Sequence, residues 1–227
     1  AKILTLLLFF YKLNYYHGMT KPELRKISRS SVAELSVFEK KEYSSKACSL
    51  FLQSELFSTS DIVFSYAATP SEIDPQLISR AALSKGKILA FPKTVPGTSD
   101  MDFYLAPQER KFESFFTEGA WGIKEPDCGC ELFLPESESF KKICARKKIC
   151  VIVPGVAFSC GGTRLGHGKG FYDIYLERLL NAACLCGAEV FLVGMCFSCQ
   201  LRDSVPAESH DAVMNFILSE KSFFSVG

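Results

Sequence analysis

Segment 161–173 holds the residues with the clearest capacity for chemistry. Its alternating glycines are Gly166, Gly168 and Gly170. Because glycine has no Cβ, backbone N–H groups there approach an anion closely, and Arg164 and Lys169 add full positive charges. Asp173 follows just inside an expected helix, where a carboxylate beside a polyphosphate is a suitable Mg²⁺ ligand, direct or through water. The segment therefore predicts a site for a phosphate chain and Mg²⁺.

The glycine spacing alone is a weak signal. It matches neither the Walker A loop, since Gly-Lys-Ser/Thr is missing, nor the dinucleotide pattern G-x-G-x-x-G. Alternating glycines also occur in ordinary turns, and Phe171 and Tyr172 have packing on a sheet as the alternative to ligand contact. The phosphate interpretation depends on the combination of arginine, lysine, glycines and an acid at one strand-to-helix junction.

Short apolar segments alternate with helical ones after residue 60. The expected strands cover residues 62–66, 87–91, 101–105, 148–153 and 189–193. The expected helices cover residues 75–85 and 171–186. Strand–helix–strand order with short apolar strands indicates a parallel sheet covered by helices. The predicted fold class is α/β, a single-domain three-layer sandwich with a mostly parallel central sheet.

The N-terminal part reads as helical. Thr20 is a suitable N-cap for a first helix. The apolar stripe of this helix is expected to continue through Leu35 and Phe38. A second helix is expected over residues 41–56, and the stretch 106–138 is expected to be irregular.

Residues 1–18 contain a short apolar run. The apolar run 3–11 has about nine residues, whereas roughly 20 are needed to span a bilayer. No small-residue cleavage site follows it, which disfavours a signal peptide. We favour Met19 as the natural start, with residues 1–18 as an extension of uncertain origin; an additional helix is the alternative. Residues 19–227 then form one domain.

Composition excludes several classes of function. The net charge is +1, which gives no electrostatic footprint for nucleic acid or an anionic membrane. The ten cysteines lack the paired spacing of a zinc site. We expect reduced thiols in the cytoplasm, with Cys144, Cys150 and Cys184 packed as small hydrophobes.

Several ordered motifs resemble one known family. Pro154-Gly-Val-Ala-Phe158 and Gly162-x-Arg-Leu-Gly-x-Gly-x-Gly-x-Tyr-Asp173 resemble the signature of the 5-formyltetrahydrofolate cyclo-ligase (methenyltetrahydrofolate synthetase) family. The further matching blocks are Lys21-x-x-x-Arg25, Ser65-Tyr66, Glu72-Ile-Asp74, Phe91-Pro92-Lys93, Met101-Asp-Phe103, Trp121-Gly-Ile-x-Glu-Pro126, Val205-Pro and His210-Asp211. The resemblance covers nearly the whole chain after Met19.

The resemblance implies a fold like that of sugar-phosphate isomerases and CoA transferases. It also implies ATP- and Mg²⁺-dependent cyclisation of 5-formyltetrahydrofolate to 5,10-methenyltetrahydrofolate, through phosphorylation of the formyl oxygen and with release of ADP and phosphate. The implied partner is the small-molecule folate, polyglutamylated forms included, and the protein is expected to be a monomer. The alternatives are a nucleotide-binding paralogue without this activity and a sugar-phosphate isomerase or CoA-transferase-like protein.

Site residues also follow from the resemblance. The implied catalytic residues are Arg164, Lys169 and Tyr172. The implied ATP-binding residues are Lys21, Arg25, Arg164, Leu165, Gly166, His167, Gly168, Lys169, Gly170, Phe171 and Tyr172. The implied folate-binding residues are Ala67, Glu72 and Trp121, and the implied Mg²⁺ ligands are Asp173 and Asp211.

Each implied role has a structural alternative, and three positions depart from the family pattern. Lys21 and Arg25 form a solvated basic helix face by default, Glu72 could begin a helix, Trp121 could pack in the core, and Asp211 could cap a strand.

The departures from the family pattern lie at His167, where the family often has a larger or more basic residue, at Asn215, where an acid is frequent, and in segment 67–71.

Overall fold

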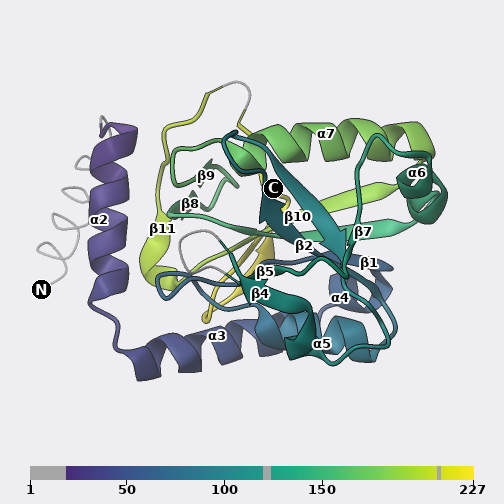
Figure 1. Ribbon diagram of the computed structural model, residues 1–227. Coiled ribbons are helices and arrows are strands. Elements are labelled where there is room, and N and C mark those ends of the chain that lie inside the picture. Colours follow the sequence, from purple (N-terminus) through teal and green to yellow (C-terminus); the bar gives the residue numbers. More distant parts are fainter. Residues whose placement is uncertain (1–18, 120–123, 209–210) are drawn as a thin grey trace, which may run out of the picture.

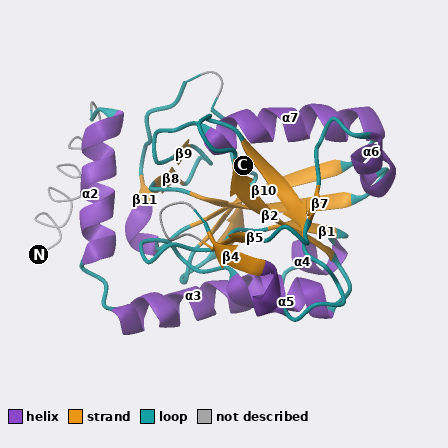
Figure 2. Cartoon of the chain, viewed as in Figure 1, coloured by secondary structure: helices purple, strands orange, loops and turns teal. Residues whose placement is uncertain are grey.

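An eight-stranded mixed sheet forms the centre of the protein in the computed structural model, which describes residues 19–119, 124–208 and 211–227 (Figures 1 and 2). From edge to edge its strands are β13 (Phe223–Ser225), β12 (Phe216–Leu218), β10 (Glu189–Met195), β7 (Lys148–Pro154), β1 (Ile62–Phe64), β2 (Ile88–Thr94), β3 (Met101–Leu105) and β6 (Glu131–Leu132). The strands from β12 to β2 are parallel, and β13, β3 and β6 are antiparallel additions at the two edges. The predicted mostly parallel α/β sheet is confirmed.

Helices cover both faces of this sheet. Figures 1 and 2 show α6 (Glu138–Cys144) and α7 (Phe171–Cys186) along one face, and α3 (Val37–Leu52) and α5 (Gln76–Ser84) along the other. The other helices of the described residues are α2 (Lys21–Ala33), α4 (Glu55–Thr59) and the 3₁₀ turns η1 (Phe112–Phe115) and η3 (Ser198–Gln200). None of the helices in the described ranges combines the length and apolarity that crossing a membrane requires.

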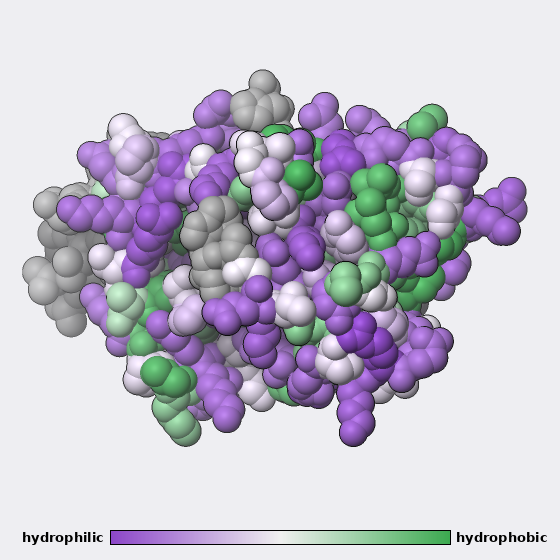
Figure 3. All heavy atoms as spheres, viewed as in Figure 1, coloured by the Kyte–Doolittle hydropathy of each residue, from purple (hydrophilic) through white to green (hydrophobic). Residues whose placement is uncertain are grey.

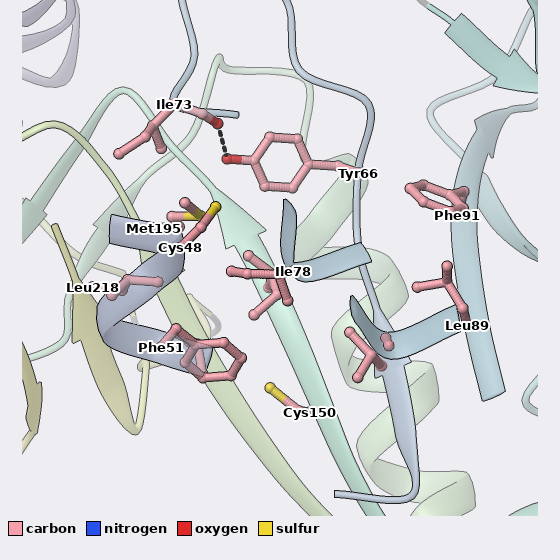
Figure 4. Packing of buried hydrophobic residues seen from close by; sticks show 14 of the residues in the cluster. Cys48, Phe51, Tyr66, Ile73, Ile78, Leu89, Phe91, Cys150, Met195 and Leu218 are labelled. Atoms are coloured by element: carbon pink, nitrogen blue, oxygen red, sulfur yellow. Dashed lines mark hydrogen bonds between the residues drawn. The ribbon is translucent and has the colours of Figure 1, made fainter. Parts of the chain in front are cut away.

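The central strands are apolar throughout because both of their faces are buried. In β1, Val63 packs into the cluster that includes α3 and α5 residues, whereas Ile62 and Phe64 pack into the cluster that includes α7 residues. Figure 4 shows part of the first cluster, with Cys150 of β7 near Phe51 of α3. This two-sided burial explains why parallel strands read as continuous hydrophobic runs rather than as an alternation.

Two small sheets complete the fold. β8 (Ala157–Ser159), β9 (Arg164–Leu165) and β11 (Leu201–Arg202) form a three-stranded sheet after β7. β4 (Phe116–Glu118) pairs with β5 (Lys124–Pro126), so the stretch expected to be irregular contains short strands. Such two- and three-residue strands carry too few residues to show a periodic pattern in the sequence.

The predicted helix bounds hold at α7 but fail near the N-terminus. The first helix ends at Ala33, and α3 already starts at Val37 because Ser36 and Glu39 form a capping box. Phe38 consequently lies on α3 with 75% of its surface exposed, rather than on a continuing apolar stripe. The second helix also stops early, since Ser54 caps the separate helix α4.

Two of the cysteines expected in the core lie there, and Asn215 lies at the entry of β12. Cys144 and Cys150 are buried as expected, whereas Cys184 is exposed on α7, so its expected core packing is wrong. The side chain of Asn215 accepts a hydrogen bond from the Leu192 N–H at 2.8 Å, which ties the entry of β12 to β10.

We predict that Tyr175→Phe leaves the protein as stable or makes it more stable. The ring packs 4.6 Å from the Phe103 ring, measured between centroids, but its buried hydroxyl has no hydrogen-bond partner among the described residues. An unpaired buried hydroxyl costs about 1–3 kcal/mol, whereas the control Phe103→Ala should lose about 3–5 kcal/mol by opening a cavity. Urea unfolding measures both, and a clear loss of stability in Tyr175→Phe would contradict this packing.

Candidate functional site

A cavity of about 490 Å³ lies where α2, the segment after β1 and the segment before α7 meet. Every predicted site residue that the structure describes lines it: Lys21, Arg25, Ala67, Glu72, Arg164, Leu165, Gly166, His167, Gly168, Lys169, Gly170, Phe171, Tyr172, Asp173 and Asp211. Trp121 and His210 lie outside the described residues. Residues up to 190 positions apart in sequence therefore share one cavity, of a size that suits small-molecule ligands.

The glycine-rich loop forms one wall of this cavity and leads directly into α7. Gly168 and Gly170 have φ values of +105° and +74°, a backbone conformation that side chains with a Cβ rarely adopt. Gly170 is the N-cap of α7 and provides no side-chain cap. The first N–H groups of this helix therefore keep their capacity to bind an anion, which the helix dipole also favours.

Helix α2 closes the cavity from the other side. Its Leu24 packs in a small apolar cluster with Ala157, Leu165 and Val205, which seats the helix on the sheet that contains β8 and β9. Arg25 Nε then donates to the carbonyl of Gly166 at 2.9 Å. Figure 1 shows α2 standing beside β8 and β11 at this end of the molecule.

Lys21, one turn before Arg25, is held by two acids. Its Nζ lies 2.7 Å from Glu208 Oε1 and 3.1 Å from Asp211 Oδ2. The hydrogen bond to Glu208, more than the smaller contribution of Asp211, raises the pKa of Lys21 above its ordinary value. Lys21 and Arg25 are thus half-buried and engaged, so the default of a solvated basic helix face is wrong.

A partly buried ion pair joins Arg164 to Asp173 across the loop. The Arg164 side chain is 4% exposed, and its Nη2 lies 2.5 Å from Asp173 Oδ1. Its Nη1 donates to the Pro154 carbonyl at 3.4 Å, while Nε has no partner among the described residues. Arg164 therefore links the end of β7 to the first turn of α7, and part of the guanidinium that was expected to face phosphate is directed at Asp173.

Tyr172 brings a neutral hydroxyl to the cavity. Its buried Oη has no hydrogen-bond partner among the described residues, and its ring centroid lies 5.7 Å from Arg164 Cζ. Burial, with a smaller effect of Glu72, raises the pKa of Tyr172 well above the ordinary 10.0. The residue therefore acts as a phenol that donates or accepts a hydrogen bond, not as a phenolate.

Glu72 places a carboxylate in the same cavity. Its side chain is 12% exposed, accepts a hydrogen bond from the Thr69 N–H at 2.9 Å and lies 3.4 Å from His167 Nε2. Burial raises the pKa of Glu72, but the hydrogen bonds from His167 and Thr69 outweigh this effect, so the net pKa lies below the ordinary 4.5. The alternative of a helix-entry role fails, because α5 begins only at Gln76.

Asp173 and Asp211 both line the cavity, and each already has a cationic partner, Arg164 and Lys21 respectively. Asp211 Oδ2 also accepts from the Glu208 N–H at 2.8 Å, which organises the loop before β12. Within the described ranges, no group of three or more His, Cys, Asp or Glu residues is arranged to hold a metal ion. Their role as Mg²⁺ ligands stays a prediction.

Sequence reasoning missed several residues that line this cavity. The strand wall opposite the loop contributes Thr94 of β2 and Glu125 of β5, and Thr94 Oγ1 donates to Glu125 Oε1 at 2.9 Å. Glu125 belongs to the family-like motif around Trp121, and Tyr66 belongs to the Ser65-Tyr66 block, so the motifs could have indicated both as site residues. Glu208, the partner of Lys21, belongs to none of these motifs.

The chain is similar to known proteins over most of its length. A family model described as the 5-formyltetrahydrofolate cyclo-ligase family matches residues 18–220. A Schizosaccharomyces pombe protein named probable 5-formyltetrahydrofolate cyclo-ligase is 29% identical over 209 residues, which cover 89% of this chain and 96% of the relative. A Caenorhabditis elegans protein of the same name is 29% identical over 157 residues, with coverages of 69% and 72%. The solved structure of Aquifex aeolicus 5,10-methenyltetrahydrofolate synthetase has a TM-score of 0.69 at 27% identity, over 92% of this chain and 93% of that one.

We predict that Glu72→Gln destabilises the protein at neutral pH and that this loss shrinks in acid. Because the folded pKa of Glu72 is lowered, its stabilising effect is present above 4.5 and is lost as the pH falls through the folded value. Urea unfolding of both proteins at neutral pH and at several values below 4.5 measures the difference. A difference that is equal at every pH would contradict an ionised, hydrogen-bonded Glu72.

Proposed function

Because this chain belongs to the 5-formyltetrahydrofolate cyclo-ligase family, we propose that it cyclises 5-formyltetrahydrofolate to 5,10-methenyltetrahydrofolate, with ATP as co-substrate and with Mg²⁺. The observation that carries the proposal is one shared cavity. The cavity of about 490 Å³ is lined by a glycine loop whose cations suit a triphosphate. The same cavity is lined by Glu72, whose carboxylate suits the N–H groups of a pterin. ATP and the folate could thus meet within a single chain, which also supports action as a monomer.

The proposed reaction needs an activated formyl oxygen, since this oxygen is otherwise a poor leaving group. The formyl oxygen attacks the γ-phosphorus of ATP, the bond from that phosphorus to the β-phosphate oxygen breaks, and ADP leaves. N10 of the folate then attacks the formyl carbon, the N10–H proton passes to the phosphate, and the carbon–oxygen bond breaks to release that phosphate. Such chemistry asks the protein for positioning and charge neutralisation rather than for a covalent intermediate.

The residues around the cavity match these demands. Arg25, Lys169 and the N-terminus of α7 would hold the phosphates, and Arg164 would support them from below. The neutral hydroxyl of Tyr172, which lacks a protein partner among the described residues, would donate a hydrogen bond to the formyl-derived oxygen as it leaves with phosphate. Glu72, with Ala67 and Trp121, would hold the folate.

Mg²⁺ has two fitting ligands in the proposed site. The carboxylates of Asp173 and Asp211 line the same cavity and offer the oxygen ligands that Mg²⁺ prefers. When bound, the ion would neutralise charge on the phosphates. Both acids would then have to share their oxygens with Arg164 and Lys21.

We also propose that the sheet belongs to the type shared by sugar-phosphate isomerases and CoA transferases. A mostly parallel sheet with helices on both faces supports this, but the architecture alone does not determine activity. We retain the division at residue 19, the acceptance of polyglutamylated folates and a cytoplasmic location as predictions.

The test follows absorbance of the methenyl product after mixing the protein with 5-formyltetrahydrofolate, ATP and Mg²⁺. We expect product, with ADP released only when the folate is present. Tyr172→Phe should lower kcat on the order of 10²-fold, as for loss of one donor to a developing anion, without loss of stability. The matched control is Tyr175→Phe, which makes the same change one turn later on α7. Because Tyr175 lies outside the cavity, this variant should keep full activity. Nucleotide binding without any product would instead indicate the inactive paralogue.

A further inference from the structure

His167 lies between the two halves of the site. It belongs to the glycine loop that follows β9, yet its Nε2 lies 3.4 Å from Oε1 of Glu72, which belongs to the segment between β1 and α5. The His167 side chain is 48% exposed and Glu72 is 12% exposed. The contact therefore connects the expected phosphate loop to the expected folate carboxylate at the surface of the cavity.

The same pair forms part of the wall of a second cavity. This smaller cavity, of about 280 Å³, is lined by Glu72 and His167 together with residues of α2, α3 and the segment that follows β7. Glu72 and His167 thus separate two hollow spaces. A side chain in such a wall has room to turn to either side.

The second cavity would attract the Glu72 carboxylate. Arg29 and Lys40 line it, and Glu72 is the only acid among its described lining residues. Lys40 Nζ donates a hydrogen bond to the Pro70 carbonyl at 3.3 Å. Opposite charges on the wall of one cavity attract each other even in partly solvated surroundings. The 3.4 Å contact with His167 Nε2 and the hydrogen bond from the Thr69 N–H oppose that movement.

The backbone on both sides of His167 belongs to the phosphate loop. The Gly166 carbonyl accepts the hydrogen bond of Arg25, and a Cβ added at Gly168 would lie 3.4 Å from Arg25 Cζ. A triphosphate bound against this loop and Arg25 would restrict the position of the residue between the two glycines. Occupancy of the loop would thereby restrict His167.

We propose that His167 is a positioning residue that holds the Glu72 carboxylate in the first cavity and couples nucleotide binding to folate binding. With the loop filled, His167 keeps Glu72 directed at the folate; with the pair broken, Glu72 turns towards Arg29 and Lys40. The coupling is reciprocal, so the folate also favours nucleotide binding. The inference rests on the proposed function.

The experiment measures the Kd of 5-formyltetrahydrofolate by titration, with and without a non-hydrolysable ATP analogue and Mg²⁺. In the unchanged protein we expect the analogue to tighten folate binding at least about fivefold, the lower end of typical coupling. His167→Phe keeps the ring but loses the donor, so the effect of the analogue should disappear and the KM for folate should rise more than kcat falls. His167→Gln, whose amide can still donate to Glu72, should restore the coupling.

A second variant tests the competing position of Glu72. As a single substitution, Arg29→Ala should leave activity intact. When it is combined with His167→Phe, it should recover part of the folate affinity that His167→Phe loses. Urea unfolding checks that each variant folds.

Equal folate affinity and equal coupling in His167→Phe and the unchanged protein would overturn the inference, as would a variant that loses only nucleotide affinity. Absence of folate binding in the unchanged protein would contradict the proposed function itself. The two failures are therefore distinguishable.

Discussion

The site depends on the ion pair between the buried Arg164 side chain and the partly exposed Asp173. Arg164 stands at the end of the small sheet and Asp173 in the first turn of α7, so the pair ties both ends of the loop between them to the body of the protein. A buried charge is tolerated only with a well-placed partner, which makes loss of either residue costly. With its ends fixed and its interior rich in glycine, the loop presents backbone N–H groups in one arrangement.

Helix α2 forms another wall of the cavity that the glycine loop lines. Burial of Leu24 seats the helix, and Arg25 and Lys21 then reach the loop and the acids before β12. The first cavity is therefore bounded by segments from the beginning, middle and end of the chain. Elsewhere the surface visible in Figure 3 is mostly hydrophilic, with hydrophobic side chains in small separate groups.

The sequence predicts local features of this protein well and distant contacts poorly. The bounds of α7 and the positions of the central strands follow from apolar runs and from Gly170 and Gly187, which flank that helix. The break after Ala33 was missed because a capping box at Ser36 outweighs a loose apolar stripe. The edge strands are too short to show a pattern.

The same division applies to the candidate site. The composition of the loop predicts an anion site from residues within one short segment. By contrast, the pairs Lys21–Glu208 and Glu72–His167 join residues far apart in sequence, and no spacing rule reveals them. The ion pair between Arg164 and Asp173 is also visible only in the structure. From the sequence, Arg164 is expected to bind phosphate and Asp173 to bind Mg²⁺.

The most direct measurement is a crystal structure of the protein with a non-hydrolysable ATP analogue and Mg²⁺. Our account predicts the triphosphate between Arg25 and the N–H groups of residues 166–170, with the Arg164–Asp173 pair still beneath it. A nucleotide bound outside this cavity, or a loop that unfolds from α7 to receive it, would contradict the account.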